Sequence, residues 1–323
     1  MPSPERAEPD LRPFPEADSR QHASPARLLT IVIIVLEGRE KLARCLSALT
    51  GPATSIGHEI IVPYDASHRD VVSLERQFPG VHFLPSPGRH THAKLRALAV
   101  QQASGDIVAI TEDHCIPAPD WPDQVLVEHE IPHAAIGGTV EKTVPDTLLN
   151  WSLYLADYVR YANPALAGMV DQITDCNATY KRVALRQIAD VWYKEFHEPE
   201  VNAALRGIGE TLWFAPAVVV HQQRDLSLSE AVRDRFAFGR LFGARRAVGG
   251  TARRRLFYAA LSPFLPLLLT ARIGGQVVRK RRYMGPFLRA LPIVICLNAV
   301  WAWGEFVGNL TGGATGSPKP IMH

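Results

Sequence analysis

Cysteine is scarce in this chain, which has only four among 323 residues, and no two of them form a C-x-x-C pair. They are Cys45, Cys115, Cys176 and Cys296. No apolar stretch that would serve as a secretory signal occurs in the first 27 residues. This pattern predicts reduced thiols and a cytosolic setting, and the length excludes a small scaffold that depends on disulfides.

Apolar residues are sparse near the two ends of the sequence. Residues 1–27 hold six prolines among charged and small residues, and residues 311–323 contain Gly, Ser and Pro. We predict a disordered tail over 1–27 and a flexible tail over 311–323. The chain as a whole is 47% hydrophobic and 21% charged, which excludes a disordered or collagenous protein.

Acidic residues are scarce between residues 224 and 289, where fifteen Lys and Arg stand against three Asp and Glu. This segment contains no helix-turn-helix, zinc or ribonucleoprotein motif, so we predict no nucleic-acid partner. It adjoins the only long apolar stretches of the chain. Basic clusters beside apolar segments are typical of proteins that meet anionic lipid, and we therefore predict a membrane partner.

Runs rich in Ile and Val alternate with amphipathic segments in the first third of the chain. We expect strands at 28–36, 59–62, 81–84 and 107–111, and helices at 39–49, 70–78 and 91–103. This alternation predicts an α/β fold with a mostly parallel, Rossmann-like sheet flanked by helices. Ligands of such sheets bind beyond the carboxyl ends of the strands, so residues 63–67 and 112–114 are expected near the site.

Three side chains able to bind a metal follow the last of these strands: Glu112, Asp113 and His114. Carboxylate oxygens suit Mg²⁺ or Mn²⁺, whereas an imidazole shifts the preference toward Mn²⁺ and softer ions. An acidic turn at a strand end is also commonly a solvated surface feature. The motif alone therefore leaves a metal site and a solvated turn both open.

The surroundings of this motif resemble glycosyltransferase family 2, whose members are inverting nucleotide-sugar transferases with a GT-A fold. The family's acidic signature lies between a Gly-Asp strand and a Cys-x-Pro-x-Pro-Asp-Trp segment, which correspond here to 105–111 and 115–121. The resemblance implies that Glu112 and Asp113 bind the nucleotide of the donor. It also implies that His114, together with Asp113, holds a divalent metal, Mn²⁺ or Mg²⁺, although His114 stands where the family has Asp.

Earlier blocks of the sequence match the family in the same order. Residues 59–67 resemble the strand that ends in Asp-Asp-Gly-Ser and contacts the nucleoside, with Asp65 retained and Tyr64 replacing the first Asp. The resemblance implies nucleotide contacts from Asp65, from Glu37 after the first strand, and from Arg96, whose rigid guanidinium suits a diphosphate. Without the resemblance, Arg96 is equally well explained as a solvated helix residue.

Later blocks match the acceptor side of the family. Asn177 is the best-matched residue of one segment, and Glu198 and Glu200 align with the family's second acidic box. The resemblance implies that Asn177 and Glu200 contact the acceptor, that Glu198 is the catalytic base, and that His221 is a further metal or diphosphate ligand. A carboxylate suits the base, because burial raises its pKa toward working pH. Taken alone, the acidic pair favours a helix N-terminus, and His221 a strand cap.

The resemblance covers 28–223, which we expect to be the catalytic domain, and the remainder differs in character. We expect basic amphipathic interfacial helices over 224–255 and apolar membrane-associated helices over 256–310. Residues 290–304 carry no charge. A helix of that length reaches about 22 Å, short of a hydrocarbon core of about 30 Å unless its flanks contribute. Either apolar segment is therefore a marginal membrane span, and a pair of buried helices in a soluble domain is the alternative.

Basic clusters at 253–255 and 279–282 flank the first apolar segment. Both should lie in the cytoplasm beside anionic lipid, where an enzyme that uses nucleotide sugars also needs its catalytic domain. We therefore expect 256–278 to dip into the membrane without crossing it, and 287–308 to cross once.

Together these features predict a membrane-associated inverting glycosyltransferase with a cytoplasmic catalytic domain. It would move a sugar from a nucleotide diphosphate donor to a hydroxyl of a lipid-linked or envelope glycan acceptor. Two alternatives stay open: a catalytically silent GT-A-like scaffold protein of an envelope-assembly complex, suggested by Tyr64 and His114, and a nucleotidyltransferase. Release of nucleoside diphosphate, of pyrophosphate or of neither separates the three hypotheses.

Overall fold

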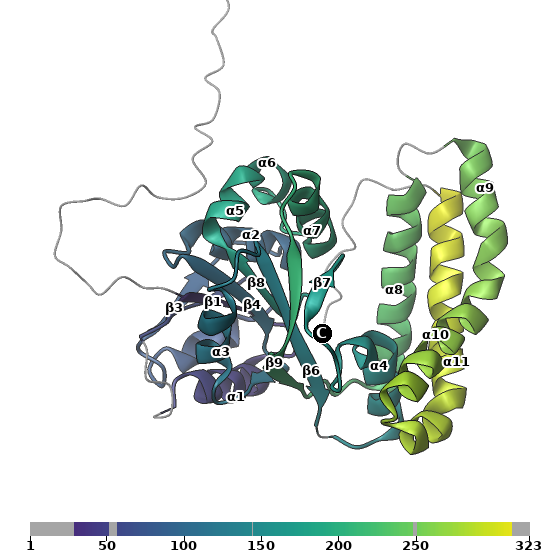
Figure 1. Ribbon diagram of the computed structural model, residues 1–323, viewed down its shortest axis with the longest axis horizontal. Helices are drawn as coiled ribbons and strands as arrows, with labels where there is room; N and C mark the ends of the chain where they lie inside the picture. The colour runs from purple at the N-terminus through teal and green to yellow at the C-terminus, as the bar shows by residue number, and fades with distance from the viewer. Residues whose placement is uncertain (1–28, 52–56, 144, 248–250, 312–323) are drawn as a thin grey trace, which may run out of the picture.

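The computed structural model describes residues 29–51, 57–143, 145–247 and 251–311. A mixed nine-stranded sheet with helices on both faces forms one part of the molecule, and helices of the last third stand beside it (Figure 1). We call residues 29–222 the sheet domain and residues 228–311 the helical region. The predicted tail 1–27, and all but the first residue of the predicted tail 311–323, lie outside the described residues.

Four parallel strands form the first half of the sheet in the order β3-β2-β1-β4. They are β1 (Leu29–Ile34), β2 (Glu59–Tyr64), β3 (Val81–Pro85) and β4 (Ile107–Glu112). Every residue of β1 is buried, as expected for a strand that helices cover on both faces. The carboxyl ends of these strands therefore meet at one edge of the sheet, as the alternation predicted.

The connections in this half are α1 (Arg39–Leu49), the 3₁₀ helix η1 (Arg69–Leu74) and α2 (His92–Gln102). The predicted helices at 39–49 and 91–103 are confirmed to within a residue. The helix predicted near 70–78 is present as the shorter 3₁₀ helix η1, which ends at Leu74. Its backbone bonds span three residues, as from Val71 N to the His68 carbonyl at 3.2 Å.

The second half of the sheet is mixed. Strand β8 (Asn177–Lys181) runs antiparallel to β4 and to β6 (Ala135–Lys142), and β6 runs parallel to β9 (Leu212–Gln222). The short strands β5 (Cys115–Pro117) and β7 (Gly168–Val170) pair antiparallel with β9. The α/β fold class is thus confirmed, with the purely parallel pairing confined to the first four strands.

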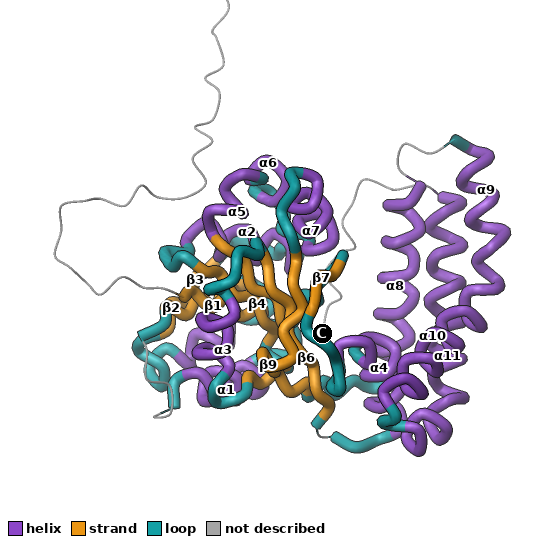
Figure 2. Tube along the Cα trace, viewed as in Figure 1, coloured by secondary structure: helices purple, strands orange, loops and turns teal. Residues whose placement is uncertain are grey.

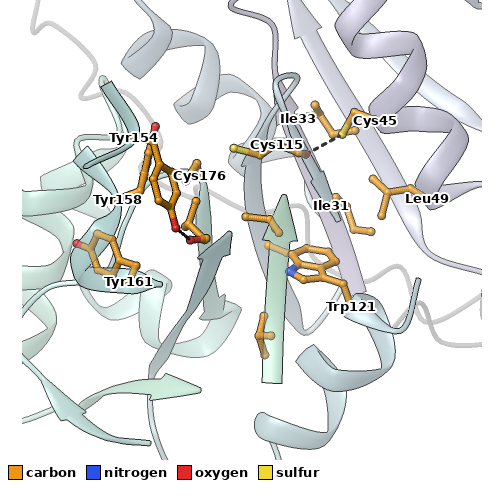
Figure 3. Packing of buried hydrophobic residues seen from close by; sticks show 14 of the residues in the cluster. Ile31, Ile33, Cys45, Leu49, Cys115, Trp121, Tyr154, Tyr158, Tyr161 and Cys176 are labelled. Carbon is orange, nitrogen blue, oxygen red and sulfur yellow. Dashed lines mark hydrogen bonds between the residues drawn. The ribbon is translucent and has the colours of Figure 1, made fainter. Parts of the chain in front are cut away.

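Further helices surround this half: α3 (Trp121–Glu128), α4 (Leu148–Asp157), η2 (Val159–Tyr161), α5 (Arg182–Gln187), α6 (Ala189–Trp192) and α7 (Glu198–Gly207). Because side chains alternate along a strand, Ile31 packs into one apolar core and its neighbour Val32 into another. Figure 3 shows part of the first core, with Trp121 of α3 near β9 and the rings of Tyr154 and Tyr158 farther along. This core continues into the helical region, because it includes buried residues of α10 and α11.

The helical region contains α8 (Leu228–Ala247), α9 (Ala252–Leu261), η3 (Ser262–Phe264), α10 (Leu265–Lys280) and α11 (Met284–Thr311). Figure 2 shows α8 and α11 side by side, with α4 between them and the sheet. Residues 252–280 and 284–311 form helices long and apolar enough to cross a membrane, by length and composition.

Glycines bring the backbones of α8 and α11 into direct contact. A Cβ atom on Gly239 would overlap the carbonyl oxygen of Trp301, and one on Gly304 would overlap that of Phe236. Gly243 and Gly308, each one turn farther along its helix, show the same close approach. Two small-x-x-x-small patterns therefore face each other in parallel register, a packing also used between helices in membranes.

The turn between α10 and α11 binds the helical region to the sheet domain. Lys280 is buried and donates from Nζ to the Ala162 carbonyl at 2.5 Å, while Arg282 and Tyr283 both bond to Glu141. The expectation that the whole basic cluster 279–282 meets lipid is therefore wrong for Lys280, whose charge is buried within the protein. Arg282 is partly exposed and pairs with Glu141 at 2.9 Å.

Candidate active site

Asp113 shapes the loop between β1 and α1. Its Oδ2 atom accepts hydrogen bonds from the backbone N–H groups of Leu36, Glu37 and Gly38 at 3.0, 2.8 and 2.9 Å. Gly38 has φ of 93°, a conformation that favours glycine, and α1 begins at the next residue. Asp113 is completely buried, so its carboxylate holds the loop that presents Glu37.

Glu37 lies where this loop meets the segment that follows β9. Its carboxylate is 3.8 Å from both Lys41 Nζ and Arg224 Nε. Burial raises the pKa of Glu37, although the nearby His114 and Arg224 partly offset the increase. The residue is thus a partly enclosed carboxylate with basic neighbours, at the carboxyl edge of the parallel strands.

Asp65 lies at the same edge, directly after β2. Its two carboxylate oxygens accept the backbone N–H groups of Ser67 at 2.7 Å and of His90 at 2.6 Å. Burial alone would raise the pKa of Asp65, but these hydrogen bonds outweigh it and lower the pKa. Asp65 therefore stays ionised and fixes the loop before α2.

Arg96 gathers three carboxylates from distant parts of the sequence. Its guanidinium lies 2.8 Å from Glu112 at the end of β4, 2.9 Å from Glu198 at the start of α7, and 3.7 Å from Asp175. Arg96 is buried, so the solvated alternative is wrong. A guanidinium can serve several acceptors at once because its five N–H donors are fixed in one plane.

This environment brings the pKa values of Glu112 and Glu198 close to neutral pH. Burial raises the pKa of each to about 7, even though Arg96 favours the ionised form of both. Each group therefore exchanges a proton in the physiological range. A carboxyl with such a pKa is suited to general acid or base chemistry.

Glu198 also faces a cavity of about 600 Å³, which we call the site cavity. Its lining combines polar side chains, among them Glu198 and Asp175, with apolar ones, among them Phe238 and Phe242 of α8 and Trp301 of α11. The helical region thus forms a wall of the cavity beside the candidate base. Burial, an altered pKa and a cavity meet at this one side chain.

His114 is buried between two carboxylates. Its Nε2 lies 3.5 Å from Glu112 Oε2, and its Nδ1 lies 3.7 Å from Asp113 Oδ1. Within the described part of the chain, neither ring nitrogen makes a hydrogen bond. Burial lowers the pKa of His114, but Asp113 and Glu112 outweigh this effect and raise it.

The fit of these residues to a metal is partial. Among the described residues, no group of three His, Cys, Asp or Glu side chains is arranged to hold an ion. His114 Nε2 and Glu112 Oε2 offer two donors on one side, whereas Asp113 Oδ2 is taken up by the loop. His221 lies on β9 opposite Ile116, and no hydrogen bond or ion pair of the described chain joins it to His114. Two protein donors suit Mg²⁺ or Mn²⁺ when substrate phosphates supply others.

The sequence of residues 30–189 matches the family described as Glycosyl transferase family 2. The chain belongs to glycosyl transferase family 2. This membership confirms the resemblance found in the acidic motif and its neighbouring blocks. No curated protein sequence matches the chain significantly.

Several solved structures are similar to this chain at low sequence identity. GalNAc-T7 with UDP, GalNAc and Mn²⁺ is 14% identical with a TM-score of 0.48; the match covers 64% of this chain and 46% of that one. The mannosyltransferase PcManGT from Pyrobaculum calidifontis, in complex with GDP-Man and Mn²⁺, is 15% identical with a TM-score of 0.46 and coverages of 90% and 76%. TarS 1–349 of S. aureus is 11% identical with a TM-score of 0.44 and coverages of 88% and 91%. The chain therefore spans less than half the length of the GalNAc-T7 chain.

The two predicted acceptor residues, Asn177 and Glu200, do not share the cavity that Glu198 faces. Asn177 is completely buried, and its side chain bonds to Trp121 at 2.9 Å, to Thr139 at 3.0 Å and to Val218 at 2.9 Å, so it ties β8 to its surroundings. Glu200 is half-exposed, with its carboxylate 3.7 Å from Arg245 of α8. Neither side chain lines the site cavity.

Sequence reasoning missed the contribution of the helical region to this site. Arg224 lines the site cavity and pairs with Asp234 at 2.9 Å, yet it appeared to be part of a membrane-binding basic block. It lies one residue beyond the end of the family resemblance. Arg224 comes two residues after β9, and β9 pairs with β5, the strand that directly follows the acidic motif 112–114. Its position just after that strand was the signal available in the sequence.

Proposed function

We propose that this glycosyltransferase moves a sugar from a nucleotide diphosphate donor to a hydroxyl of an amphipathic, lipid-linked acceptor, with inversion at the sugar. The observation that carries the proposal is the site cavity, where Glu198 shares one space with apolar side chains of the helical region. A polar group to be activated and an apolar body to be bound would both find partners there.

Glu198 acts as the base in this proposal. The acceptor oxygen bonds to the anomeric carbon of the sugar, the bond from that carbon to the diphosphate oxygen breaks, and the acceptor proton passes to Glu198. The pKa of about 7, set first by burial, leaves a large ionised fraction at neutral pH and still makes the group basic enough to accept a proton. One displacement inverts the sugar carbon.

Arg96 is a positioning residue in this reaction. It touches Glu198 and Glu112 at once, so it connects the proposed base on α7 with the acidic motif after β4. Its charge also keeps two buried carboxyls partly ionised, because each has its pKa lowered by the guanidinium. Removing it should disturb both sides of the site together.

The donor would lie along the carboxyl edge of the parallel strands. We assign its nucleoside to the neighbourhood of Asp65 and Glu37, which follow β2 and β1. Asp113 contributes by holding the backbone of residues 36–38. The diphosphate would face the acidic motif, where cations must offset its charge.

A divalent ion, Mn²⁺ or Mg²⁺, would be held by His114 Nε2 and Glu112 Oε2, which lie 3.5 Å apart. When bound, such an ion stabilises charge on a leaving diphosphate. The raised pKa of His114 means that a proton and an ion compete for this nitrogen. Donor binding that depends on Mn²⁺ should therefore weaken in the variant His114→Ala.

Membrane association of the helical region is part of the proposal. Exposed apolar side chains gather on α9, η3 and α10: Leu256, Phe257, Leu261, Phe264, Leu267 and Leu268. The basic residues 253–255 stand at the start of this surface, as expected at the interface with anionic lipid.

We favour a helical region that lies in the membrane surface over one in which α11 crosses. Since α8 runs in parallel contact with α11, a crossing would carry the arginines of α8 into the hydrocarbon, where charges are expensive. Glu305 of α11 is itself buried and paired with Arg246 of α8. The sheet domain and the turn at 280–283 would then share one side, which we take to be cytoplasmic.

The test is an assay of the purified chain with nucleotide sugars and membrane lipid extract. We expect release of nucleoside diphosphate that requires the lipid, and a loss of about 10²-fold or more in the variant Glu198→Gln with donor binding retained. Glu130→Gln, an exposed carboxylate at the end of α3, is the matched control. Release of pyrophosphate would instead indicate a nucleotidyltransferase, and donor binding without turnover would indicate a scaffold protein.

A further inference from the structure

A second cavity of about 250 Å³ lies where α4 and η2 meet α8, α10 and α11. It shares Asp157, Arg160, Arg235 and Trp301 with the site cavity, so the two spaces adjoin along these side chains. Nothing in the proposed transfer step uses it. We call it the basic cavity, because of the charges that line it.

Three guanidinium groups and one carboxylate line the basic cavity. Arg235, which is nine-tenths buried, pairs with Asp157 at 2.7 Å, and this pair is close to neutral. Arg160 lies over the ring of Tyr161, at 4.4 Å from its centroid. The charges of Arg160 and Arg272 are therefore in excess, and the cavity favours an anion.

Arg272 is exposed at the mouth of this cavity. It lies in an apolar stretch of α10, and in the described part of the chain it makes no hydrogen bond or ion pair. Two apolar residues of the same helix, Leu269 and Ile273, line the cavity beside it. A guanidinium beside apolar side chains at the membrane surface is placed to meet the phosphate of a lipid.

We infer that the basic cavity binds the phosphate group of a phosphate-bearing lipid, with Arg272 and Arg160 contacting the anion and the acyl or prenyl chain leaving along α10. This inference rests on the proposed function in one respect: the same lipid would present its hydroxyl to Glu198 through the adjoining site cavity. Guanidinium groups bind phosphate through paired hydrogen bonds, and apolar walls suit the first part of the chain.

The binding test needs neither donor nor transfer. The full chain in neutral detergent is titrated with dioctanoyl phosphatidic acid, with dioctanoyl glycerol, which lacks the phosphate, and with inorganic phosphate. Thermal stabilisation and native mass spectrometry report binding. We expect saturable binding of the phosphatidic acid, at least tenfold weaker binding of the glycerol lipid, and inorganic phosphate weaker again because it lacks the chain.

Matched variants of α10 locate the site. Arg272→Gln should weaken binding of phosphatidic acid by about tenfold or more, the scale of one charge-assisted hydrogen bond. Arg279→Gln makes the same change two turns along the helix, at a residue that is exposed like Arg272 but does not line the cavity. Arg279 donates at 2.6 Å to Oε1 of Gln276, a cavity residue that stays in place in this variant, so the affinity should remain within twofold. If Arg272→Gln fails to fold, Arg160→Gln tests the same anion contact from the exposed side chain on η2.

Three results would overturn the inference. Equal losses in the two α10 variants would indicate general surface attraction. Equal affinity for inorganic phosphate and phosphatidic acid would indicate a site for small anions that does not bind the lipid chain. Equal affinity for the two lipids would show that the phosphate group does not contribute to binding. Because these readouts are independent of transfer, specific binding combined with a silent transfer assay would refute the proposed function and leave the basic cavity standing.

Discussion

The sheet domain and the helical region use different kinds of contact to join elements that are far apart in the sequence. In the sheet domain, Arg96 joins elements that are far apart in sequence through its ion pairs with the buried carboxylates of Glu112 and Glu198. In the helical region, α8 and α11 join through backbone contact at glycines such as Gly239 and Gly304. The Arg96 contacts are formed by carboxylates that can be protonated. The contact between α8 and α11 is formed by backbone atoms at positions without side chains.

This difference determines how each region should respond to change. Buried ion pairs respond to pH and to loss of charge, because an unpaired buried charge is strongly unfavourable. A glycine contact is insensitive to pH but has no room for a single added carbon. We therefore expect pH and single charge changes to alter activity through the sheet domain. The wall that the helical region supplies to the site cavity should be rigid and insensitive to pH.

The largest effect is expected for Arg96→Gln, which leaves Glu112 and Glu198 buried without their shared cation. Removing one partner of a buried ion pair destabilises a protein by about 3–5 kcal/mol. Arg206→Gln breaks an exposed pair with Asp171 at 3.1 Å and should change stability by less than about 1 kcal/mol. Thermal unfolding at pH 7.5 measures the stability of both variants. Equal losses of stability would show that burial does not make the Arg96 ion pairs more important than an exposed pair.

The next effect concerns the glycine contact. Gly304→Ala forces its Cβ against the Phe236 carbonyl, and overpacking of this kind destabilises by about 1–3 kcal/mol. Gly275→Ala on α10 is the control, because among the described residues no atom lies within 4 Å of the added carbon. The control should be neutral or stabilising, since alanine favours helix by up to about 1 kcal/mol over glycine. Limited proteolysis between β9 and α8 would report detachment, and an unchanged Gly304→Ala variant would show that the helices are not in backbone contact.

The third prediction concerns the pH dependence of activity, which should come from the sheet domain alone. Since burial raises the pKa of Glu198 to about 7, kcat/KM should rise about tenfold per pH unit below 7 and level off above it. The protonated carboxyl cannot accept the acceptor proton, which sets the sign. The residual activity of Glu198→Gln should lack this limb, and a limb that persists there would assign it to another group.

The sequence predicted the parts of this molecule that depend on local pattern. The helix at 39–49 and the strand ends predicted at 62 and 111, which the structure has at 64 and 112, follow from apolar spacing. The family resemblance singled out Glu198, which lines the site cavity. The partners of Arg96 could not be read from sequence, because three separate elements bring them together. The glycines of α8 and α11 show four-residue spacing in the sequence, but only packing reveals which helix each pair meets.

The smallest expected effect is at the junction between the two regions. Tyr283 donates its hydroxyl to Glu141 Oε2 at 2.8 Å, and burial followed by the Glu141 charge raises the pKa of Tyr283 to about 12, so the donor proton is present at neutral pH. Tyr283→Phe removes this bond while Arg282 still pairs with Glu141 at 2.9 Å.

The expected loss for Tyr283→Phe is about 1 kcal/mol of unfolding free energy, measured by thermal unfolding in neutral detergent. Tyr258→Phe on α9 is the matched control, because its hydroxyl has no hydrogen-bond partner among the described residues and the ring contacts survive. A loss confined to Tyr283→Phe that leaves the pH profile of transfer unchanged would show that the junction stabilises the assembly without tuning the site. Equal stability of the two variants would mean that the Tyr283 hydroxyl does not stabilise the turn, and that Lys280 and Arg282 hold the junction without it.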